Sequence, residues 1–578
     1  MYNKNLIFFS LKVIALFFFL IVNIPLIWML ALYSGSLFLE IYKWLQLISI
    51  ILVLYVFKNK IITFPMANLI YLFYSILAGY YIFTDTKLDS SFLLRNLGEI
   101  DDIVPRFIYQ FSVVFSVASI NSFILYKFRP NFKNKFFYII PILFIISPQL
   151  IHRQELNNEL ICFVESIFKK DKVIDYYQSN YIQLIQDSIK RKHDIIGQAR
   201  KINKEQLPKY LENIIILQIE SLNADLVNER NTPYFTAISR EGIFFPKIYG
   251  NSVQTILGQE NMLCSLPCSF DVSLVATEYD KQVLSLPKIL KGMGFKTFFL
   301  KCFHLSFTRS GEFMTNIDFD EVHGVDIMGP KDVLYRWGYK GDIFYKRAFD
   351  YFQKNKKEKY NFIFLSIGAT NHWPFNITPG FEDIVPYKYP KNFRERFINT
   401  TFLQDQYLQV AWREINNIFP EKNYTLIITG DHSWPAGFHE NNIFGGKGAF
   451  EENFVTSTIM IIGDEEKYKN KIITTRYSLM DIMPSILDLF GLNFVNKFSR
   501  SFIKELNGEE VPKSKILLVQ PFSDKYLNII DWPLKYQYNS HRRNIVLYNL
   551  EEDPGEENSQ IISNNEEENL QFIRELLN

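Results

Sequence analysis

Two apolar runs in the sequence each end abruptly at side chains that can bind a metal ion. The first run, residues 214–219, ends at Glu220, and the second, residues 426–429, ends just before Asp431 and His432. Apolar runs of this length, bounded by polar turn residues, are typical of parallel strands buried on both faces. Ligands of an open α/β sheet bind just beyond the carboxyl ends of such strands. The two ends can therefore converge on one divalent cation, which indicates a metalloenzyme.

A threonine at the expected start of a helix is the candidate nucleophile. Thr255 follows a polar stretch and opens a helical segment. The free N–H groups and the dipole of a helix amino terminus stabilise anions such as phosphate. A threonine hydroxyl is a poor nucleophile unless a base or a metal lowers its pKa. Beside a cation held by Glu220, Asp431 and His432, Thr255 could react as an alkoxide. Taken alone, the segment is better explained by a threonine that caps the helix.

Further candidates lie in loops that follow predicted strands. His372 stands beside Trp373 after the strand 361–367, and His439 follows the Asp-His pair. Either histidine could protonate a leaving alkoxide or hold a phosphate oxygen. Arg309 could bind phosphate through two parallel hydrogen bonds, although a surface arginine explains its presence equally well.

Apolar strands alternate with amphipathic stretches from residue 211 onward. Strands are predicted at residues 213–219, 296–300, 361–367, 424–429 and 456–462. Helices are predicted near residues 255–266, 284–293, 342–354, 400–418 and 478–490. This alternation predicts an α/β domain with a mainly parallel central sheet and helices on both faces.

The first quarter of the chain differs sharply from the rest of its 578 residues. Phe, Leu, Ile and Tyr dominate residues 1–152, and five apolar stretches have nearly the length that a bilayer requires. They cover residues 13–33, 41–57, 61–83, 107–126 and 136–151. We therefore expect a transmembrane helical bundle of about five spans over 1–152, a helical linker over 153–210 and a catalytic domain over 211–578.

The basic residues of the connecting loops predict the orientation of these spans. Lys4 and Lys12 precede the first span, and residues 127–135 between the fourth and fifth spans contain four basic side chains. The loop 34–40 has none. Because basic loops stay in the cytoplasm, the amino terminus should be cytoplasmic and the catalytic domain extracytoplasmic. The first stretch is too long for a secretory signal and lacks a small-residue cleavage site, so we expect it to be retained.

Charge and cysteine content narrow the function further. The net charge of +1 argues against nucleic acid, which needs a concentrated basic surface. Disulfides are permitted outside the cytoplasm, so Cys264 could pair with Cys268, or either could pair with Cys302. The sequence does not choose among these pairings.

In this order, the motifs resemble those of the lipoteichoic acid synthase-like branch of the alkaline phosphatase/sulfatase superfamily. Its relatives include membrane phosphoglycerol transferases and, more distantly, phosphoethanolamine transferases. The matching segments are Ile219-Glu220-Ser221, Thr255 running into Leu263-Cys264-Ser265-Leu266-Pro267, Phe307-Thr308-Arg309, Trp337-Gly338, Asp342-Ile343-Phe344, Thr370-Asn371-His372-Trp373-Pro374-Phe375, Gly430-Asp431-His432, Asp481-Ile482-Met483-Pro484-Ser485-Ile486-Leu487 and Leu547-Tyr548-Asn549-Leu550-Glu551-Glu552-Asp553-Pro554-Gly555-Glu556.

The resemblance implies that Glu220, Thr255, Asp431 and His432 bind one divalent cation, with Thr255 as the nucleophile. Phe307 occupies a position where relatives often have Trp, beside the phosphate-binding Arg309. The residues after Thr255 lack the Cys-x-Pro-x-Arg type motif that sulfatases convert to formylglycine, so sulfate ester hydrolysis is not expected.

The expected activity is transfer of a phosphoglycerol-type headgroup from a membrane phospholipid, with phosphatidylglycerol the favoured donor, to an envelope glycan or lipid. The expected cation is Mn²⁺ or Zn²⁺, and the expected location is the cell membrane. The alternatives are a phosphoethanolamine transferase, an extracytoplasmic phosphodiester hydrolase or an inert binding module that retains the fold.

Overall fold

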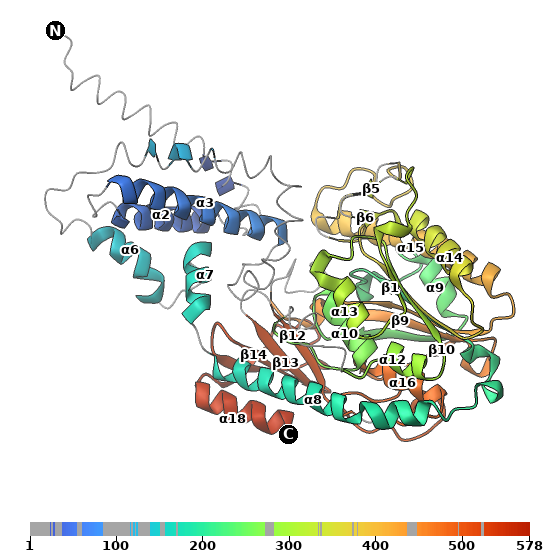
Figure 1. The fold of residues 1–578 in the computed structure, drawn as a ribbon. Helices are drawn as coiled ribbons and strands as arrows, with labels where there is room; N and C mark the ends of the chain where they lie inside the picture. The colour runs from blue at the N-terminus through green and yellow to red at the C-terminus, as the bar shows by residue number, and fades with distance from the viewer. Residues whose placement is uncertain are drawn as a thin grey trace, which may run out of the picture. The chain divides into compact units, whose positions relative to one another are not determined.

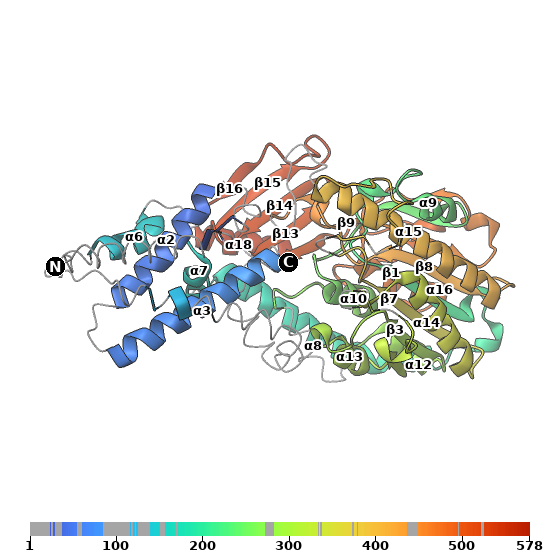
Figure 2. The same ribbon diagram turned by 90° about the horizontal axis from the view of Figure 1, so that it is seen from above.

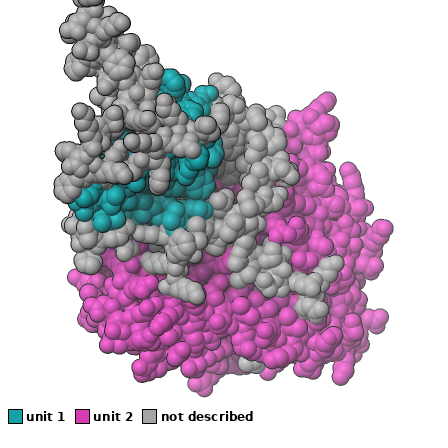
Figure 3. Space-filling model, turned by 60° about the vertical axis from the view of Figure 1, so that its left-hand side comes forward, with its two compact units in different colours: residues 1–169 teal, residues 170–578 magenta. Residues whose placement is uncertain are grey.

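The computed structural model forms two compact units, unit 1 over residues 1–169 and unit 2 over residues 170–578 (Figures 1 and 3). Unit 2 is described from residue 171 except for 272–282, 333, 336–337, 373–374, 378–379, 436–447, 495 and 522–524. Unit 1 is described at residues 23–24, 27–28, 37–54, 60–84, 116, 119–121, 123–124, 139–150 and 157–168.

Unit 2 is built on a nine-stranded sheet in the order β10-β2-β9-β8-β1-β7-β3-β4, with β11 also paired to β2. Strand β9 runs antiparallel to its neighbours β2 and β8, and the other recorded pairings in this sheet are parallel. The strands are β1 (Asn213–Ile219), β2 (Ile243–Tyr249), β3 (Lys296–Lys301), β4 (Glu321–His323), β7 (Asn361–Ile367), β8 (Tyr424–Gly430), β9 (Val455–Ile462), β10 (Lys471–Ile472) and β11 (Tyr477–Ser478). The predicted mainly parallel sheet is thus confirmed.

Helices cover both faces of this sheet because its central strands are apolar on both sides (Figure 2). In β1, Ile214 and Ile216 belong to one hydrophobic core, while Ile215 and Leu217 belong to the other. The first core includes side chains of α8 (Lys172–Ala199), α10 (Thr255–Cys264), α12 (Leu286–Gly292), α13 (Ser310–Asn316), α16 (Ile482–Leu489) and α17 (Ile503–Leu506). The second includes side chains of α9 (Pro233–Ser239), α14 (Gly341–Asn355) and α15 (Phe393–Ile418).

The predicted helices and strands correspond to observed elements. Some of their ends are shifted, because a capping side chain sets where the helix begins. Helix α15 begins seven residues before the predicted 400, because the side chain of Asn392 accepts the backbone N–H of Glu395 at 2.9 Å and caps the helix there. Helix α8 lies within the segment predicted as a linker, and its Tyr177 and Tyr181 are fully packed in the core of unit 2.

A second sheet, which the sequence analysis did not predict, follows the central one. It is antiparallel in the order β12-β13-β14-β15-β16 and is followed by α18 (Glu566–Leu577). Its strands are β12 (Ile516–Gln520), β13 (Tyr526–Asp531), β14 (Leu534–Asn539), β15 (Asn544–Asn549) and β16 (Gln560–Ser563). This sheet is joined to the loop before α10, since the backbone N–H of Val519 donates to the carbonyl of Asn251 at 2.8 Å. A two-stranded ribbon of β5 (Leu334–Tyr335) and β6 (Gly338–Tyr339) completes unit 2.

Unit 1 contains α2 (Leu37–Leu54), α3 (Lys60–Thr84), α6 (Ile139–Leu150) and α7 (Glu159–Phe168). Within the described residues, α2 is long and apolar enough to cross a membrane, and Ile62–Ala78 and Ile139–Pro148 are shorter apolar helical segments. Most of the predicted spans 13–33 and 107–126 lies outside the described residues.

The four cysteines, all within the described part of the chain, are free thiols. The pairings considered for Cys264, Cys268 and Cys302 are therefore absent from this structure. Instead, Cys302 accepts the backbone N–H of Gly368 at 3.2 Å, and Cys268 lies 3.2 Å from the amide nitrogen of Asn261. The three thiols behave as small buried core side chains.

Candidate metal centre

Three predicted ligands meet at the carboxyl ends of β1 and β8. The ligand atoms of Glu220, Asp431 and His432 all lie within 4.8 Å of one another. The His432 Nε2 atom is 3.4 Å from Oε1 of Glu220 and 3.6 Å from Oδ2 of Asp431. The three residues are at most 4% exposed. Within the described residues this is the group of acidic and histidine side chains that could hold a metal ion.

The strand register explains why residues so far apart in sequence meet. Strands β1 and β8 are parallel neighbours, and their last residues, Ile219 and Gly430, pair with each other. Glu220 follows β1 and Asp431 follows β8, so these two residues also lie side by side. Helix α10 packs directly on this point. A Cβ atom at Gly258 would lie 2.5 Å from the backbone oxygen of Asp431, so this close approach requires glycine.

A tight turn after β1 directs Glu220 toward the cluster. Ser221 adopts a left-handed backbone conformation, with φ of 51°, that is unfavourable for a non-glycine residue. The side-chain amide of Asn371 donates to the carbonyl of Glu220 at 3.0 Å and lies 3.2 Å from that of Ser221. The Thr400 hydroxyl in turn donates to Asn371 at 2.7 Å. These bonds hold the turn that positions Glu220.

Thr255 is the first residue of α10 and lies beside the cluster. Its hydroxyl donates to Oε2 of Glu220 at 3.1 Å. The side chain of the preceding Gln254 does not cap the helix. The hydroxyl is therefore next to the ligand atoms and at a helix amino terminus, where negative charge is stabilised.

The three side chains of the cluster shift one another's pKa values. Burial and the charge of Glu220 raise the pKa of Asp431 to about 7. Burial lowers the pKa of His432, but the carboxylates of Asp431 and Glu220 outweigh it and raise that pKa to about 9. Burial raises the pKa of Glu220, yet His432 lowers it below its usual value. The two carboxylates thus favour the protonated, positively charged form of His432.

The donor set fits a divalent cation. The Nδ1 atom of His432 is 2.9 Å from the carbonyl of Ser433, so it carries the proton when the ring is neutral and leaves Nε2 as the ligand atom. In a tetrahedral site with bonds of about 2.1 Å, ligand atoms lie about 3.4 Å apart. The distances from Nε2 of His432, 3.4 Å to Oε1 of Glu220 and 3.6 Å to Oδ2 of Asp431, are close to this spacing, and Thr255 approaches the other oxygen of Glu220, Oε2, at 3.1 Å.

The other predicted site residues are not among the ligand atoms of the cluster, or they lie outside the described part of the chain. His372 is partly buried and close enough for its charge to lower the pKa of Glu220. Arg309 pairs with Glu312, not with the cluster. Phe307 is 46% exposed. Trp373 and His439 lie outside the described residues.

Sequence reasoning missed Gln218, which contacts a predicted ligand. Its side-chain amide donates to Oδ2 of Asp431 at 2.9 Å. The signal was present, because Gln218 is the polar residue within the otherwise apolar run 214–219, at a position that the sheet buries completely. A buried polar side chain needs a partner, and here that partner is a metal-ligand candidate.

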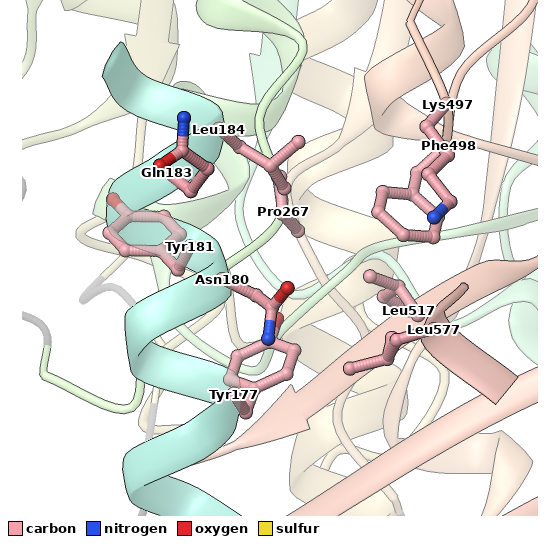
Figure 4. A pocket seen from close by; sticks show the side chains of 10 residues that line it. All are labelled: Tyr177, Asn180, Tyr181, Gln183, Leu184, Pro267, Lys497, Phe498, Leu517 and Leu577. Atoms are coloured by element: carbon pink, nitrogen blue, oxygen red, sulfur yellow. The ribbon is translucent and has the colours of Figure 1, made fainter. Parts of the chain in front are cut away.

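Unit 2 also has a pocket away from the cluster (Figure 4). It is lined by residues of α8, β12 and the C-terminal helix α18, among them Tyr181, Leu517 and Leu577. None of the predicted site residues lines it.

The sequence is similar to known proteins and to one protein family. A family model described as Sulfatase matches residues 212–492. The chain is 24% identical over 310 residues to the lipoteichoic acid synthase of Staphylococcus saprophyticus and 22% identical over 304 residues to lipoteichoic acid synthase 1 of Bacillus subtilis. Each match covers 49% of this chain and 46% of the relative, so the chain spans less than half the length of these relatives.

Solved structures share the fold of unit 2. A protein of the alkaline phosphatase superfamily from Vibrio parahaemolyticus superposes with a TM-score of 0.50 at 17% identity, covering 67% of this chain and 95% of that one. A lipoteichoic acid synthase from Listeria monocytogenes gives 0.49 at 16% identity, covering 66% and 95%. Unit 2 thus shares its fold with the Vibrio parahaemolyticus protein. In sequence, the chain is similar to lipoteichoic acid synthases and, over residues 212–492, to the family described as Sulfatase.

Proposed function

We propose that this protein transfers a phosphoglycerol-type headgroup from a membrane phospholipid to an envelope glycan or lipid, through a phosphothreonine at Thr255. One observation carries the proposal. The Thr255 hydroxyl lies 3.1 Å from Glu220, at the amino terminus of α10 and beside Asp431 and His432. The similarity to proteins named lipoteichoic acid synthase supports this choice of reaction.

Glu220, Thr255, Asp431 and His432 would hold one Mn²⁺ or Zn²⁺ ion. When bound, such an ion polarises a phosphate oxygen and lowers the pKa of a coordinated hydroxyl. The neighbouring positive end of α10 adds stabilisation of the phosphate charge. The deep burial of the ligands favours this chemistry, because electrostatic interactions are stronger where water is excluded.

The reaction has two balanced steps. Thr255 enters and leaves the reaction as the alkoxide, its proton having been lost to solvent beforehand. In the first step its oxygen forms a bond to the lipid phosphorus while the bond between phosphorus and the diacylglycerol oxygen breaks. That oxygen takes a proton from His372 or His439. In the second step the same histidine accepts the proton of an acceptor hydroxyl, whose oxygen attacks phosphorus and releases Thr255. Arg309 would exchange its partner Glu312 for the phosphate.

Phe307 and Trp373 would contact the donor headgroup. Phe307 packs edge to face against Phe303, with ring centroids 5.7 Å apart, and still exposes nearly half of its surface. An exposed ring beside Arg309 can cover a bound headgroup without further rearrangement.

We further propose that residues 1–152 cross the membrane about five times and hold the extracytoplasmic domain near its lipid donor. In unit 1, Lys43 near the start of α2 contacts Glu159 at the start of α7, at 3.2 Å. The predicted orientation places the start of the second span and the chain after the fifth span on the same, outer side. A contact between these two points supports their lying on the same side of the membrane, and anchoring raises the effective donor concentration.

Intact-mass measurement on the detergent-purified protein tests this function. The protein is incubated with Mn²⁺ and either phosphatidylglycerol or phosphatidylethanolamine, alongside Thr255→Ala and the control Thr315→Ala, which alters an exposed threonine on α13. We expect a phosphoglycerol-sized adduct on the wild type and the control that is absent from Thr255→Ala. A phosphoethanolamine-sized adduct would transfer the assignment to that donor, and an adduct that persists in Thr255→Ala would refute the nucleophile.

A further inference from the structure

A row of buried polar side chains crosses the central sheet beside the metal cluster. Residues directly opposite each other on neighbouring strands place their side chains on one face of the sheet. The row follows the strand order β3, β7, β1, β8 and β9, and consists of Lys301, Ser366, Gln218, Thr429 and Thr458. Each is at most 1% exposed. Polar groups at such positions are costly unless they form hydrogen bonds, so the bonds they form are informative.

Two amide side chains link this row to the cluster in a fixed direction. The amide nitrogen of Gln259, on α10, donates to Oε1 of Gln218 at 2.6 Å and lies 3.2 Å from the Ser366 hydroxyl. The amide nitrogen of Gln218 then donates to Oδ2 of Asp431 at 2.9 Å. The Gln218 side chain thus accepts a hydrogen bond from Gln259 on α10 through its oxygen and donates one to Asp431 through its nitrogen. Only a side chain with both an acceptor and a donor can do this.

The bond from Gln218 reaches the carboxylate oxygen that faces the cation position. Oδ1 of Asp431 already accepts the backbone N–H groups of Ser221 at 3.0 Å and His432 at 2.9 Å. Oδ2 is the oxygen 3.6 Å from Nε2 of His432. The three bonds together fix both the position and the rotation of the carboxylate.

We propose that Gln218 and Gln259 are positioning residues for the metal centre. They hold Oδ2 of Asp431 at its ligand position and couple it to α10, on which Thr255 lies one turn before Gln259. This inference rests on the proposed metal-dependent function. Partners of metal ligands act in this way, and their removal commonly costs 10–100-fold in metal affinity.

The competing explanation is that the two amides only satisfy each other in the core. The two explanations differ in what a substitution does to the metal. If the amides are merely structural, Gln218→Met lowers stability and leaves Mn²⁺ affinity unchanged. If they position Asp431, the affinity for Mn²⁺ falls. Gln259→Met should then have the smaller effect, because Gln218 remains but is free to rotate its amide away from Asp431.

The experiment measures Mn²⁺ and Zn²⁺ dissociation constants by calorimetry on the full-length protein in detergent. Melting temperatures in chelator report any general loss of stability separately. The matched control is Thr458→Val, which changes a buried side chain of the same row whose recorded partner is Thr429, not Asp431. We expect Gln218→Met to weaken Mn²⁺ binding by about 10–100-fold. Thr458→Val should bind Mn²⁺ like the wild type, and saturating Mn²⁺ should restore the headgroup transfer of Gln218→Met.

The outcomes distinguish failure of this inference from failure of the metal centre. A folded Gln218→Met protein whose Mn²⁺ affinity stays within about twofold of the wild type overturns the inference while leaving the metal centre intact. A wild type that binds neither cation overturns the metal centre itself, and with it the proposed function. If Gln218→Met does not fold, Gln218→Glu decides in its place, because it keeps the shape and the acceptor for Gln259 but lacks the donor for Asp431.

Discussion

Binding of a divalent cation should raise the melting temperature of unit 2 by a few degrees. A ligand that binds only the folded state at 100 times its dissociation constant stabilises that state by about 2.7 kcal/mol. Unit 2 spans residues 170–578. At about 2.1 cal/mol/K per residue, its unfolding entropy is about 0.9 kcal/mol/K. The ratio of the two gives an expected rise of about 3 °C.

The variant Asp431→Asn should abolish this rise. The Asp431 carboxylate accepts hydrogen bonds from Ser221, His432 and Gln218. An asparagine at this position has no negative charge for the cation, and its side-chain NH2 group would face one of these N–H donors. Loss of a ligand should cost more than the 10–100-fold typical of its hydrogen-bonding partners. After a loss of about 1000-fold, the same metal concentration stabilises by less than about 0.1 kcal/mol.

Differential scanning calorimetry of the detergent-purified protein, first in chelator and then in excess Mn²⁺ or Zn²⁺, measures both quantities. The control is Asp405→Asn, a buried aspartate whose oxygens accept the backbone N–H groups of Tyr234 and Phe235 away from the cluster. It should keep the metal-induced rise. An equal rise in Asp431→Asn, or no rise in the wild type with either cation, would refute the assignment of these residues as metal ligands.

Substitutions at three further sites test buried charges elsewhere. Lys43→Met should destabilise unit 1 by about 3–5 kcal/mol, because it leaves the buried carboxylate of Glu159 unpaired; a denaturation midpoint equal to the wild type would contradict this. Lys535→Met should destabilise unit 2 similarly, since Lys535 and Glu556 form a fully buried pair, and Lys535→Met/Glu556→Leu should recover part of the loss. Burial raises the pKa of Asp481 to about 7. The folded state therefore binds the extra proton between about pH 4 and pH 7, and wild-type stability falls there by up to about 1.4 kcal/mol per pH unit as pH rises. Asp481→Asn should lack this contribution, and parallel pH profiles for variant and wild type would contradict it.

The central sheet and the convergence of Glu220, Asp431 and His432 could be predicted because both depend on local pattern and one general rule of α/β folds. The short apolar run 214–219 fits a strand buried on both faces, as β1 is, and Glu220 follows it directly. The carboxyl ends of parallel strands share one edge of the sheet, so Asp431 and His432 had to lie at that edge as well. Adjacency of β1 and β8 in the sheet was not needed for the prediction, although it brings the ligands into contact.

Other parts could not be predicted, because the partners are distant in sequence and the local pattern is ambiguous. The strands of the C-terminal sheet are short and pair with one another only through the register of the folded chain. The cysteines could have formed any of several pairings, and packing left all of them as thiols. Arg309 has Glu312 within one helical turn, a partner that the phosphate-binding interpretation did not consider.

By itself, the sequence determined the class of chemistry: apolar runs fix the strands, and the residues that follow them, with Thr255 at a helix start, are the metal ligands and nucleophile of the proposal. Only the tertiary structure decided how those residues are held. The bond from Gln218 to Asp431 joins side chains 213 positions apart, and Gln259 enters it from a third element. Hydrogen bonds of this kind depend on the exact separation of packed strands and helices, which no local sequence pattern encodes.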